Sequence, residues 1–130
     1  MNAKQRSLLE HLDSALRRLQ DVLAQPASEY MRDSAIQRFE FTFELFWKCL
    51  KADGEASGAQ GFSPRDCLRN AFQMGVIQED ARWFRMLEDR NLTSHTYNEA
   101  TAEAIHSRLS SHLAMMTAVA AMLKARAARD

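Results

Sequence analysis

Apolar residues recur at every third or fourth position through most of this chain, and this spacing restricts its fold more than any other feature. From Ala3 to Ala24 the apolar stripe comprises Leu8, Leu12, Leu16 with Ala15, Leu19, and Leu23 with Val22. From Glu29 to Ala52 it comprises Ile36, Phe39, Phe43, Phe46 and Leu50. Such spacing gathers side chains on one face of an α-helix and does not match the alternation of a β-strand. The sequence therefore predicts two long helices, with Glu44 and Lys48 as an i,i+4 pair on the exposed side of the second.

Capping signals divide the rest of the chain into three further helices. Residues 53–61 hold three of the four glycines and predict a flexible connector. Ser63 before Pro64 predicts the start of a short third helix that ends near Gly75. We expect a fourth helix over residues 79–92.

A fifth helix is expected from Tyr97 to about Ala125. No strand pattern is found, so the predicted fold is all-α: an antiparallel up-and-down helical bundle of about five helices with a four-helix-bundle core, formed by a single domain over residues 1–130. Its predicted core includes Phe39, Phe43, Phe46, Trp83, Leu109 and Met116.

Composition narrows the classes of function. Lys and Arg together number 17, as do Asp and Glu, so the chain lacks the overall positive charge of a protein that coats duplex nucleic acid. Cys49 and Cys67 lie in apolar helical stretches and are expected to be reduced core residues of a cytoplasmic protein. We see no metal-ligand spacing, and we expect no metal or other cofactor. The N-terminal residues are polar, and no apolar run approaches the ~20 residues that a membrane span needs, so no membrane association is expected.

The segment from Arg90 to Tyr97 is the strongest indication of function. It places a guanidinium, an imidazole and a phenol within eight residues, a combination suited to phosphodiester chemistry. On a continuous helix, Arg90 and His95 would point about 140° apart, at roughly 100° per residue. They can converge only if the helix breaks between them or if a second subunit completes the site.

Residues 92–96 favour such a break, because they are poor in strong helix formers and contain three hydroxyl side chains. Thr96 and Glu99 match a capping box, which would place Tyr97 in the first turn of the last helix, exposed and close to His95. The alternative is that Arg90 forms a surface ion pair and His95 only caps a helix. Arg6 and His11 have the same spacing, but they lie inside the first predicted helix, where they diverge and cannot form this site.

Three blocks of sequence resemble a known family: residues 38–48 (RFEFTFELFWK), residues 63–66 (SPRD) and residues 88–98 (EDRNLTSHTYN). They are similar to the nucleotidyltransferase substrate-binding protein family, part of the HEPN superfamily of small helical bundles. The resemblance extends over essentially the whole chain, and the third block is its most specific part.

The resemblance implies a HEPN-like bundle encoded beside a minimal nucleotidyltransferase. Relatives in toxin–antitoxin pairs are metal-independent ribonucleases with an Arg-x4-His-x-Tyr motif, which Arg90, His95 and Tyr97 match. By this resemblance Arg90 and His95 are catalytic, RNA is the substrate, and Tyr97 is the residue that receives AMP from the nucleotidyltransferase antitoxin. One Arg and one His per chain are sparse for cleavage, so we also expect a two-fold homodimer. The family name implies an alternative, a non-catalytic subunit that presents substrate to the nucleotidyltransferase, and an unrelated helical interaction protein is a third possibility.

Four residues are expected to support this site: Glu88, Asp89, Asn91 and Arg38. Glu88 and Asp89 would orient the guanidinium or contact the partner, although one of them can be a plain surface acid. Arg38 would reach the same cleft, or lie along the surface. His106 and His112 are interpreted as structural, and Met115, Met116 and Met122 as core or dimer packing.

Overall fold

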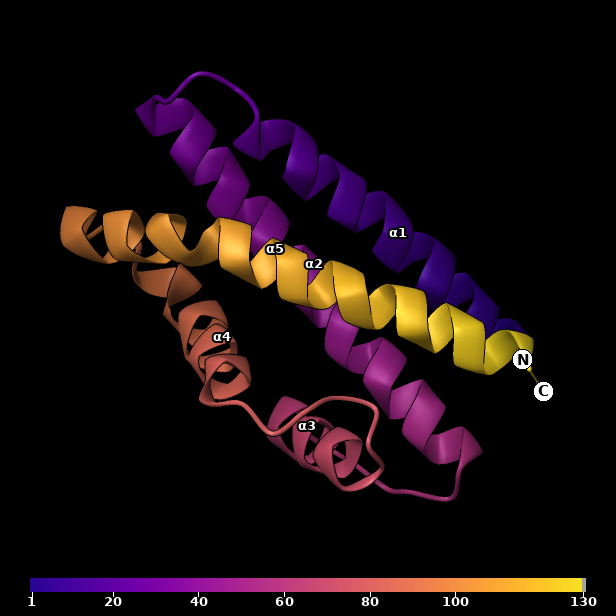
Figure 1. Ribbon diagram of the computed structural model, residues 1–130. Helices are drawn as coiled ribbons and strands as arrows, with labels where there is room; N and C mark the ends of the chain where they lie inside the picture. Colours follow the sequence, from indigo (N-terminus) through magenta and orange to yellow (C-terminus); the bar gives the residue numbers. More distant parts are fainter. Residues whose placement is uncertain (130) are drawn as a thin grey trace.

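The computed structural model describes residues 1–129, within which every regular element is helical. The elements are α1 (Ala3–Leu23), α2 (Glu29–Ala56), α3 (Pro64–Gln73), α4 (Ala81–Leu92), the 3-10 helix η1 (Thr93–His95) and α5 (Glu99–Ala128). α1 and α2 form an antiparallel pair, and α5 packs against both, while α3 and α4 lie on the remaining side of α2 (Figure 1). The predicted all-α helical bundle is confirmed.

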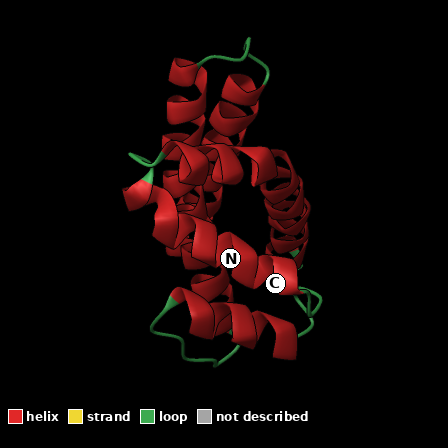
Figure 2. Ribbon diagram, turned by 90° about the vertical axis from the view of Figure 1, so that its left-hand side faces the viewer, coloured by secondary structure: helices red, strands yellow, loops and turns green. Residues whose placement is uncertain are grey.

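Short loops connect the helices (Figure 2), and side-chain caps explain most of the helix starts. Asn2 and Gln5 form a reciprocal capping box, in which the backbone N–H of Gln5 donates to the Asn2 side-chain oxygen at 2.8 Å. Ser28 caps α2, Ser63 caps α3 ahead of its proline, and Asp80 caps α4. Each cap satisfies a backbone N–H that has no partner inside its helix.

The core is formed by the apolar stripes of α1, α2 and α5 together with the inner faces of α3 and α4. All six residues predicted from their spacing are buried: Phe39, Phe43, Phe46, Trp83, Leu109 and Met116. Phe46 on α2 stacks on Trp83 of α4, with ring centroids 5.4 Å apart and planes 4° from parallel. This contact attaches the N-terminal half of α4 to the bundle, whereas its C-terminal half leads into the Arg90–Tyr97 segment.

The predicted connector over residues 53–61 begins later than expected, because α2 continues to Ala56. Asp53 accepts two hydrogen bonds from the guanidinium of Arg126 on α5, at 3.2 and 3.1 Å. A glycine inside a helix costs roughly 0.5–1 kcal/mol relative to alanine. The contact with α5 therefore offsets the cost of Gly54, and the turn forms instead at Gly58, whose φ is +87°.

The other boundaries differ by a few residues from those predicted. α4 begins at Ala81 rather than Glu79, and α5 runs from Glu99 to Ala128 rather than from Tyr97 to about Ala125. Within residues 1–129, none of the helices has the length and hydropathy needed to cross a bilayer.

Candidate functional site

The chain breaks its helical path between Arg90 and His95, as predicted. α4 ends at Leu92, and Thr93–His95 form a single 3-10 turn. The Thr93 hydroxyl donates to the carbonyl oxygen of Arg90 at 2.7 Å, and the Thr96 hydroxyl donates to the carbonyl oxygen of Thr93 at 3.3 Å. The hydroxyl side chains thus bond to the backbone where the regular α-helical ladder stops.

The predicted cap of the last helix is wrong. Asn98, not Thr96, is the N-cap of α5, and its side chain accepts from the backbone N–H of Thr101 at 3.0 Å. Tyr97 therefore lies just before α5 rather than in its first turn.

A tertiary contact accounts for this shift. Glu99, expected to reach back to Thr96, instead accepts hydrogen bonds from Arg32 on α2 at 2.8 and 3.3 Å. Arg32 is buried and also donates to Glu103 at 2.8 Å. Its hydrogen bonds hold the pKa of Glu99 below the ordinary value. The first turn of α5 is consequently attached to the start of α2, and this attachment fixes the end of the Arg90–Tyr97 segment.

Arg90 lies at the edge of the bundle, with its side chain 31% exposed. Its guanidinium forms an ion pair with Glu44 of α2, and its Nη1 donates to the Asn91 side chain at 3.2 Å. The second oxygen of Glu44 accepts from the indole N–H of Trp47 at 3.2 Å. Glu44 therefore pairs with Arg90 rather than with Lys48, and it holds the guanidinium beside the helix break.

His95 and Tyr97 are both exposed at this break, and the side chain of Tyr97 is 84% exposed. The Tyr97 hydroxyl lies 3.5 Å from Nδ1 of His95, and their rings meet edge to face with centroids 5.9 Å apart. The phenol of Tyr97 and the imidazole of His95 are thus exposed and close together, as expected. Within residues 1–129, no hydrogen bond joins Arg90 to His95, so these two side chains are presented separately.

Asp89 is one of the predicted supporting residues, but it faces away from Arg90. It is fully buried and accepts two hydrogen bonds from Arg108 of α5, at 2.8 and 2.7 Å, and one from Nε2 of His112 at 2.7 Å. Burial alone would raise the pKa of Asp89, but the hydrogen bonds from Arg108 and His112 outweigh it and leave the pKa below its ordinary value. The expectation that Asp89 orients the guanidinium of Arg90 directly is not met.

The other supporting residues divide between the site and the surface. Asn91 contacts Arg90 as described, whereas Glu88 is exposed and lies 3.6 Å from Arg85 on the same helix. Arg38 donates to the backbone carbonyl of Arg18 on α1 at 2.6 Å. Arg38 precedes Glu44 by six positions, a rotation of roughly 240° around the helix, so it faces α1 and not the motif.

Four residues hold this region through contacts that the sequence did not predict: Glu44, Arg32, Arg108 and His112, the last of which is structural as interpreted. Glu44 contacts Arg90, Arg32 contacts Glu99, and both Arg108 and His112 contact Asp89, across separations of 46, 67, 19 and 23 residues respectively. Residue spacing within one helix cannot predict contacts between different helices. The second Arg-x4-His pair behaves as expected: His11 lies 3.5 Å from Ser7 on the surface of the continuous helix α1.

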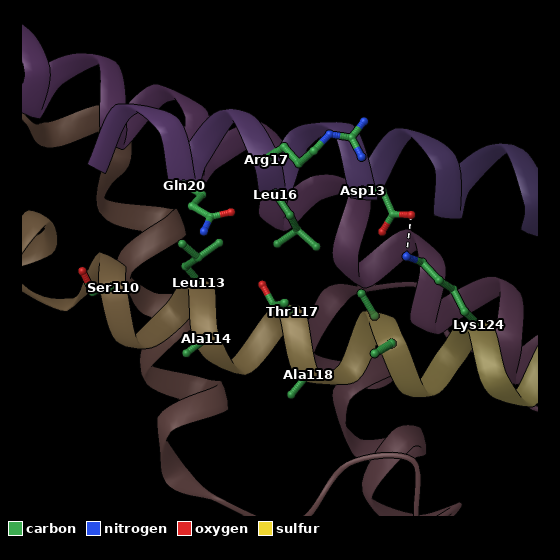
Figure 3. A pocket seen from close by; sticks show the side chains of 12 residues that line it. Asp13, Leu16, Arg17, Gln20, Ser110, Leu113, Ala114, Thr117, Ala118 and Lys124 are labelled. Atoms are coloured by element: carbon green, nitrogen blue, oxygen red, sulfur yellow. Dashed lines mark ion pairs between the residues drawn. The ribbon is translucent and has the colours of Figure 1, made fainter. Parts of the chain in front are cut away.

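A groove of about 660 Å³ lies between α1 and α5, away from the motif (Figure 3). Leu16, Ala114 and Ala118 line its apolar part, and the ion pair of Asp13 with Lys124 crosses one end. None of the motif residues lines it, so the groove is separate from the candidate site. Within residues 1–129 no cluster of three His, Cys, Asp or Glu side chains has the arrangement of a metal site.

Several known proteins resemble this chain. A protein from Haemophilus influenzae named "Probable ribonuclease HepT" is 36% identical over 86 residues, which are 61% of this chain and 58% of that protein. The chain thus spans less than two thirds of this relative's length. A crystal structure of a protein from Thermus thermophilus shares 42% identity and a TM-score of 0.81 over 86% of this chain and 98% of the other. A structure from Haemophilus influenzae, described as revealing the fold of a substrate binding domain of a nucleotidyltransferase, shares 26% identity and a TM-score of 0.80 over 89% and 98% of the two chains.

A more distant structure shows the fold alone. A HEPN toxin from Shewanella oneidensis, tri-AMPylated and in complex with an MNT antitoxin, is 18% identical, with a TM-score of 0.79 over 96% of this chain and 99% of the other. The sequence relationship is settled by the family described as nucleotidyltransferase substrate binding protein like, whose model matches residues 7–125 and therefore includes every residue of the motif. The chain belongs to this nucleotidyltransferase substrate-binding protein family.

Proposed function

We propose that this protein is the HEPN-type partner of a minimal nucleotidyltransferase and acts as a metal-independent endoribonuclease. The observation that carries the proposal is the exposed break between α4 and α5. It presents the guanidinium of Arg90, the imidazole of His95 and the phenol of Tyr97 from one short segment. A relative with 36% identity bears the name of a ribonuclease, which supports the same activity here.

The chemistry needs only these groups. The 2′-oxygen of RNA attacks the adjacent phosphorus, so a P–O2′ bond forms and the P–O5′ bond breaks, leaving a 2′,3′-cyclic phosphate and a 5′-hydroxyl. An imidazole exchanges protons near neutral pH, so His95 can accept the proton of the 2′-hydroxyl. The proton for the departing 5′-oxygen comes from water or from the imidazole of a second copy. Arg90 stabilises the negative charge that develops on the phosphoryl oxygens.

Arg90 is available for this role even though Glu44 occupies part of its guanidinium. Arginine has five N–H donors, and among residues 1–129 two of the Arg90 nitrogens are bonded, one to Glu44 and one to Asn91. The pair is also partly exposed, which makes it weak and replaceable by a phosphate. Glu44 thus keeps Arg90 at the break in the absence of RNA.

Cleavage of single-stranded RNA in EDTA tests the proposal. Wild-type protein should give 2′,3′-cyclic phosphate ends, and the variants Arg90→Ala and His95→Ala should each lose activity by about a hundredfold or more. His11→Ala is the matched control, because His11 belongs to the other Arg-x4-His pair, on α1. Unchanged cleavage by His95→Ala would overturn the assignment.

We further propose that AMP transfer to Tyr97 silences the nuclease. The phenolic oxygen would attack the α-phosphate of ATP, with pyrophosphate as the leaving group, and the attached phosphodiester would add a negative charge and bulk beside His95. The 84% exposure of Tyr97 supports its access to a second enzyme. With a cognate nucleotidyltransferase and ATP, mass spectrometry should find AMP on the wild type and on Tyr30→Phe, but not on Tyr97→Phe. Tyr30 is the matched control because it is 85% exposed and lies outside the motif.

A two-fold dimer is part of the proposal. One chain provides a single imidazole, His95, whereas cleavage involves two proton transfers, one from the 2′-hydroxyl and one to the 5′-oxygen. Light scattering at micromolar concentration should give about twice the 14.8 kDa of one chain. A monomeric mass together with full activity would contradict the shared site.

A second candidate function is a non-catalytic subunit that presents substrate to the nucleotidyltransferase. The zero net charge and the neutralisation of Arg90 by Glu44 favour this alternative, since neither creates a strong field for RNA. Tight binding to a nucleotidyltransferase without cleavage of any of several RNAs would select it.

A further inference from the structure

The last turn of α4 carries two charged residues with opposite surroundings. Asp89 points into the protein toward α5, and Arg90 points outward toward Glu44 of α2. Consecutive residues of an α-helix differ by about 100° in direction, so a single rotation of this turn moves both side chains. Whatever fixes Asp89 therefore also fixes the backbone from which Arg90 projects.

Asp89 is fixed by a cluster of three side chains, in which Asp89 and His112 are buried and Arg108 is partly exposed. Arg108 donates from both Nε and Nη2 to its two carboxylate oxygens, and His112 donates from Nε2 to one of them. The His112 ring is itself held against Phe39, with centroids 5.3 Å apart and planes 29° from parallel. The cluster thus connects α4 to α5 and, through the ring stack, to α2.

Apolar contacts alone do not fix the rotation of α4 about its axis. Met86 and Leu87 are buried, but the hydrophobic effect that favours their burial is non-directional and does not by itself specify the rotation of α4 about its axis. A bidentate Arg–carboxylate pair fixes direction as well as distance. Replacing a buried ion pair by apolar residues is often neutral or stabilising, so stability by itself does not call for these charges.

We propose that Asp89 is a positioning residue for Arg90, and that Arg108 and His112 are the groups through which it acts. This inference rests on the proposed function for its consequence in catalysis, but its structural part stands independently. Asp89, Arg108 and His112 do not touch RNA in this role. They set the orientation of the last turn of α4, and through it the position of the guanidinium at the helix break.

The test compares two Asp–Arg pairs that join other helices to α5. Arg108→Lys keeps the charge beside Asp89 but removes the two-pronged hydrogen bond, and Arg126→Lys does the same to Asp53 at the other end of α5. We expect a similar loss of thermal stability in both variants. Only Arg108→Lys should shift the side-chain NMR signals of Arg90 and the backbone amide signals of residues 90–96.

The same variants separate positioning from folding in the cleavage assay. A displacement of about 1 Å can cost on the order of a hundredfold in rate, so kcat should fall by about ten- to a hundredfold in Arg108→Lys, with a smaller change in KM. Arg126→Lys should retain wild-type kcat. If Arg108→Lys does not fold, Arg108→Gln and His112→Gln provide the same comparison.

The outcomes are distinguishable. Unchanged Arg90 signals in a folded Arg108→Lys variant, or equal shifts in Arg126→Lys, would overturn the positioning role. If wild-type protein cleaves no RNA, the proposed ribonuclease fails, but the NMR comparison still decides whether the cluster positions Arg90.

Discussion

Asp89 and Arg90 are neighbours in sequence but belong to two contrasting regions. In the Asp89 cluster, Asp89 and His112 are buried, Arg108 is partly exposed, and both carboxylate oxygens of Asp89 accept hydrogen bonds. The Arg90–Tyr97 segment is mostly exposed, and its ion pair with Glu44 and its 3.5 Å contact between Tyr97 and His95 leave several donors and acceptors open. The difference indicates a division of roles: the exposed side chains are free to meet substrate or a partner, and the buried cluster holds the backbone that carries them.

The largest expected effect is a difference in the free energy of unfolding between variants of the two regions. Asp89→Ala leaves the charge of Arg108 without its carboxylate, and we expect the free energy of unfolding to fall by about 3 kcal/mol. Arg90→Ala removes a partly exposed pair and should cost less than about 1 kcal/mol. Urea unfolding followed by circular dichroism measures both. Equal losses would contradict the contrast between the regions.

Acid should weaken the buried cluster selectively. The folded pKa of Asp89 lies below its ordinary value of 3.8, so its ionised form stabilises the fold fully above that value and loses this contribution as the pH falls through the lower folded pKa. The groups that face Asp89 are Arg85, Arg108 and His112. Between about pH 4 and pH 2, wild-type stability should therefore fall more steeply than that of Asp89→Asn, as measured by urea unfolding at each pH. The other carboxylates are common to both proteins and cancel in the difference. Parallel pH profiles would show that Asp89 is not the group responsible.

Replacing Glu44 tests how the exposed region depends on the ion pair between Glu44 and Arg90. Both side chains are about 30% exposed, so Glu44→Gln should lower the free energy of unfolding by less than about 1 kcal/mol. Because a carboxylate no longer competes with phosphate for Arg90, the KM for RNA should decrease. Steady-state cleavage and thermal unfolding measure the two quantities. An increase in KM would show that Glu44 is needed to present Arg90 and does not merely compete for it.

The smallest effect is expected at Tyr97. Within the described residues 1–129, the one hydrogen-bond contact of its hydroxyl is the 3.5 Å contact with His95, so Tyr97→Phe should change the free energy of unfolding by less than about 0.5 kcal/mol. Tyr30→Phe should behave in the same way, since the two side chains have similar exposure. Urea unfolding of both variants is the measurement. A substantial loss confined to Tyr97→Phe would mean that the exposed segment depends on its own contacts and not only on the buried support.

Local sequence patterns predicted most of the fold and the location of the motif. Apolar spacing identified the helices and six core residues, and the hydroxyl-rich stretch 92–96 marked the break between α4 and α5. The extent of α2 was underestimated, because its last turn depends on the pairing of Asp53 with Arg126 on α5. Period and capping rules describe residues within a few positions of each other, so they cannot register such a contact.

A helical bundle and an exposed segment with Arg90, His95 and Tyr97 could be read from the residues alone, because both follow from helical periodicity and from side chains that compete for backbone hydrogen bonds. How that segment is held depends on contacts between helices. Glu99 bonds to Arg32 of α2 instead of capping its own helix, and Glu44 pairs with Arg90, 46 residues away in the sequence. Asp89 points inward and bonds to Arg108 and His112 of α5. These charged groups form these hydrogen bonds with residues of other helices, and which helices lie side by side is decided only in the packed tertiary structure.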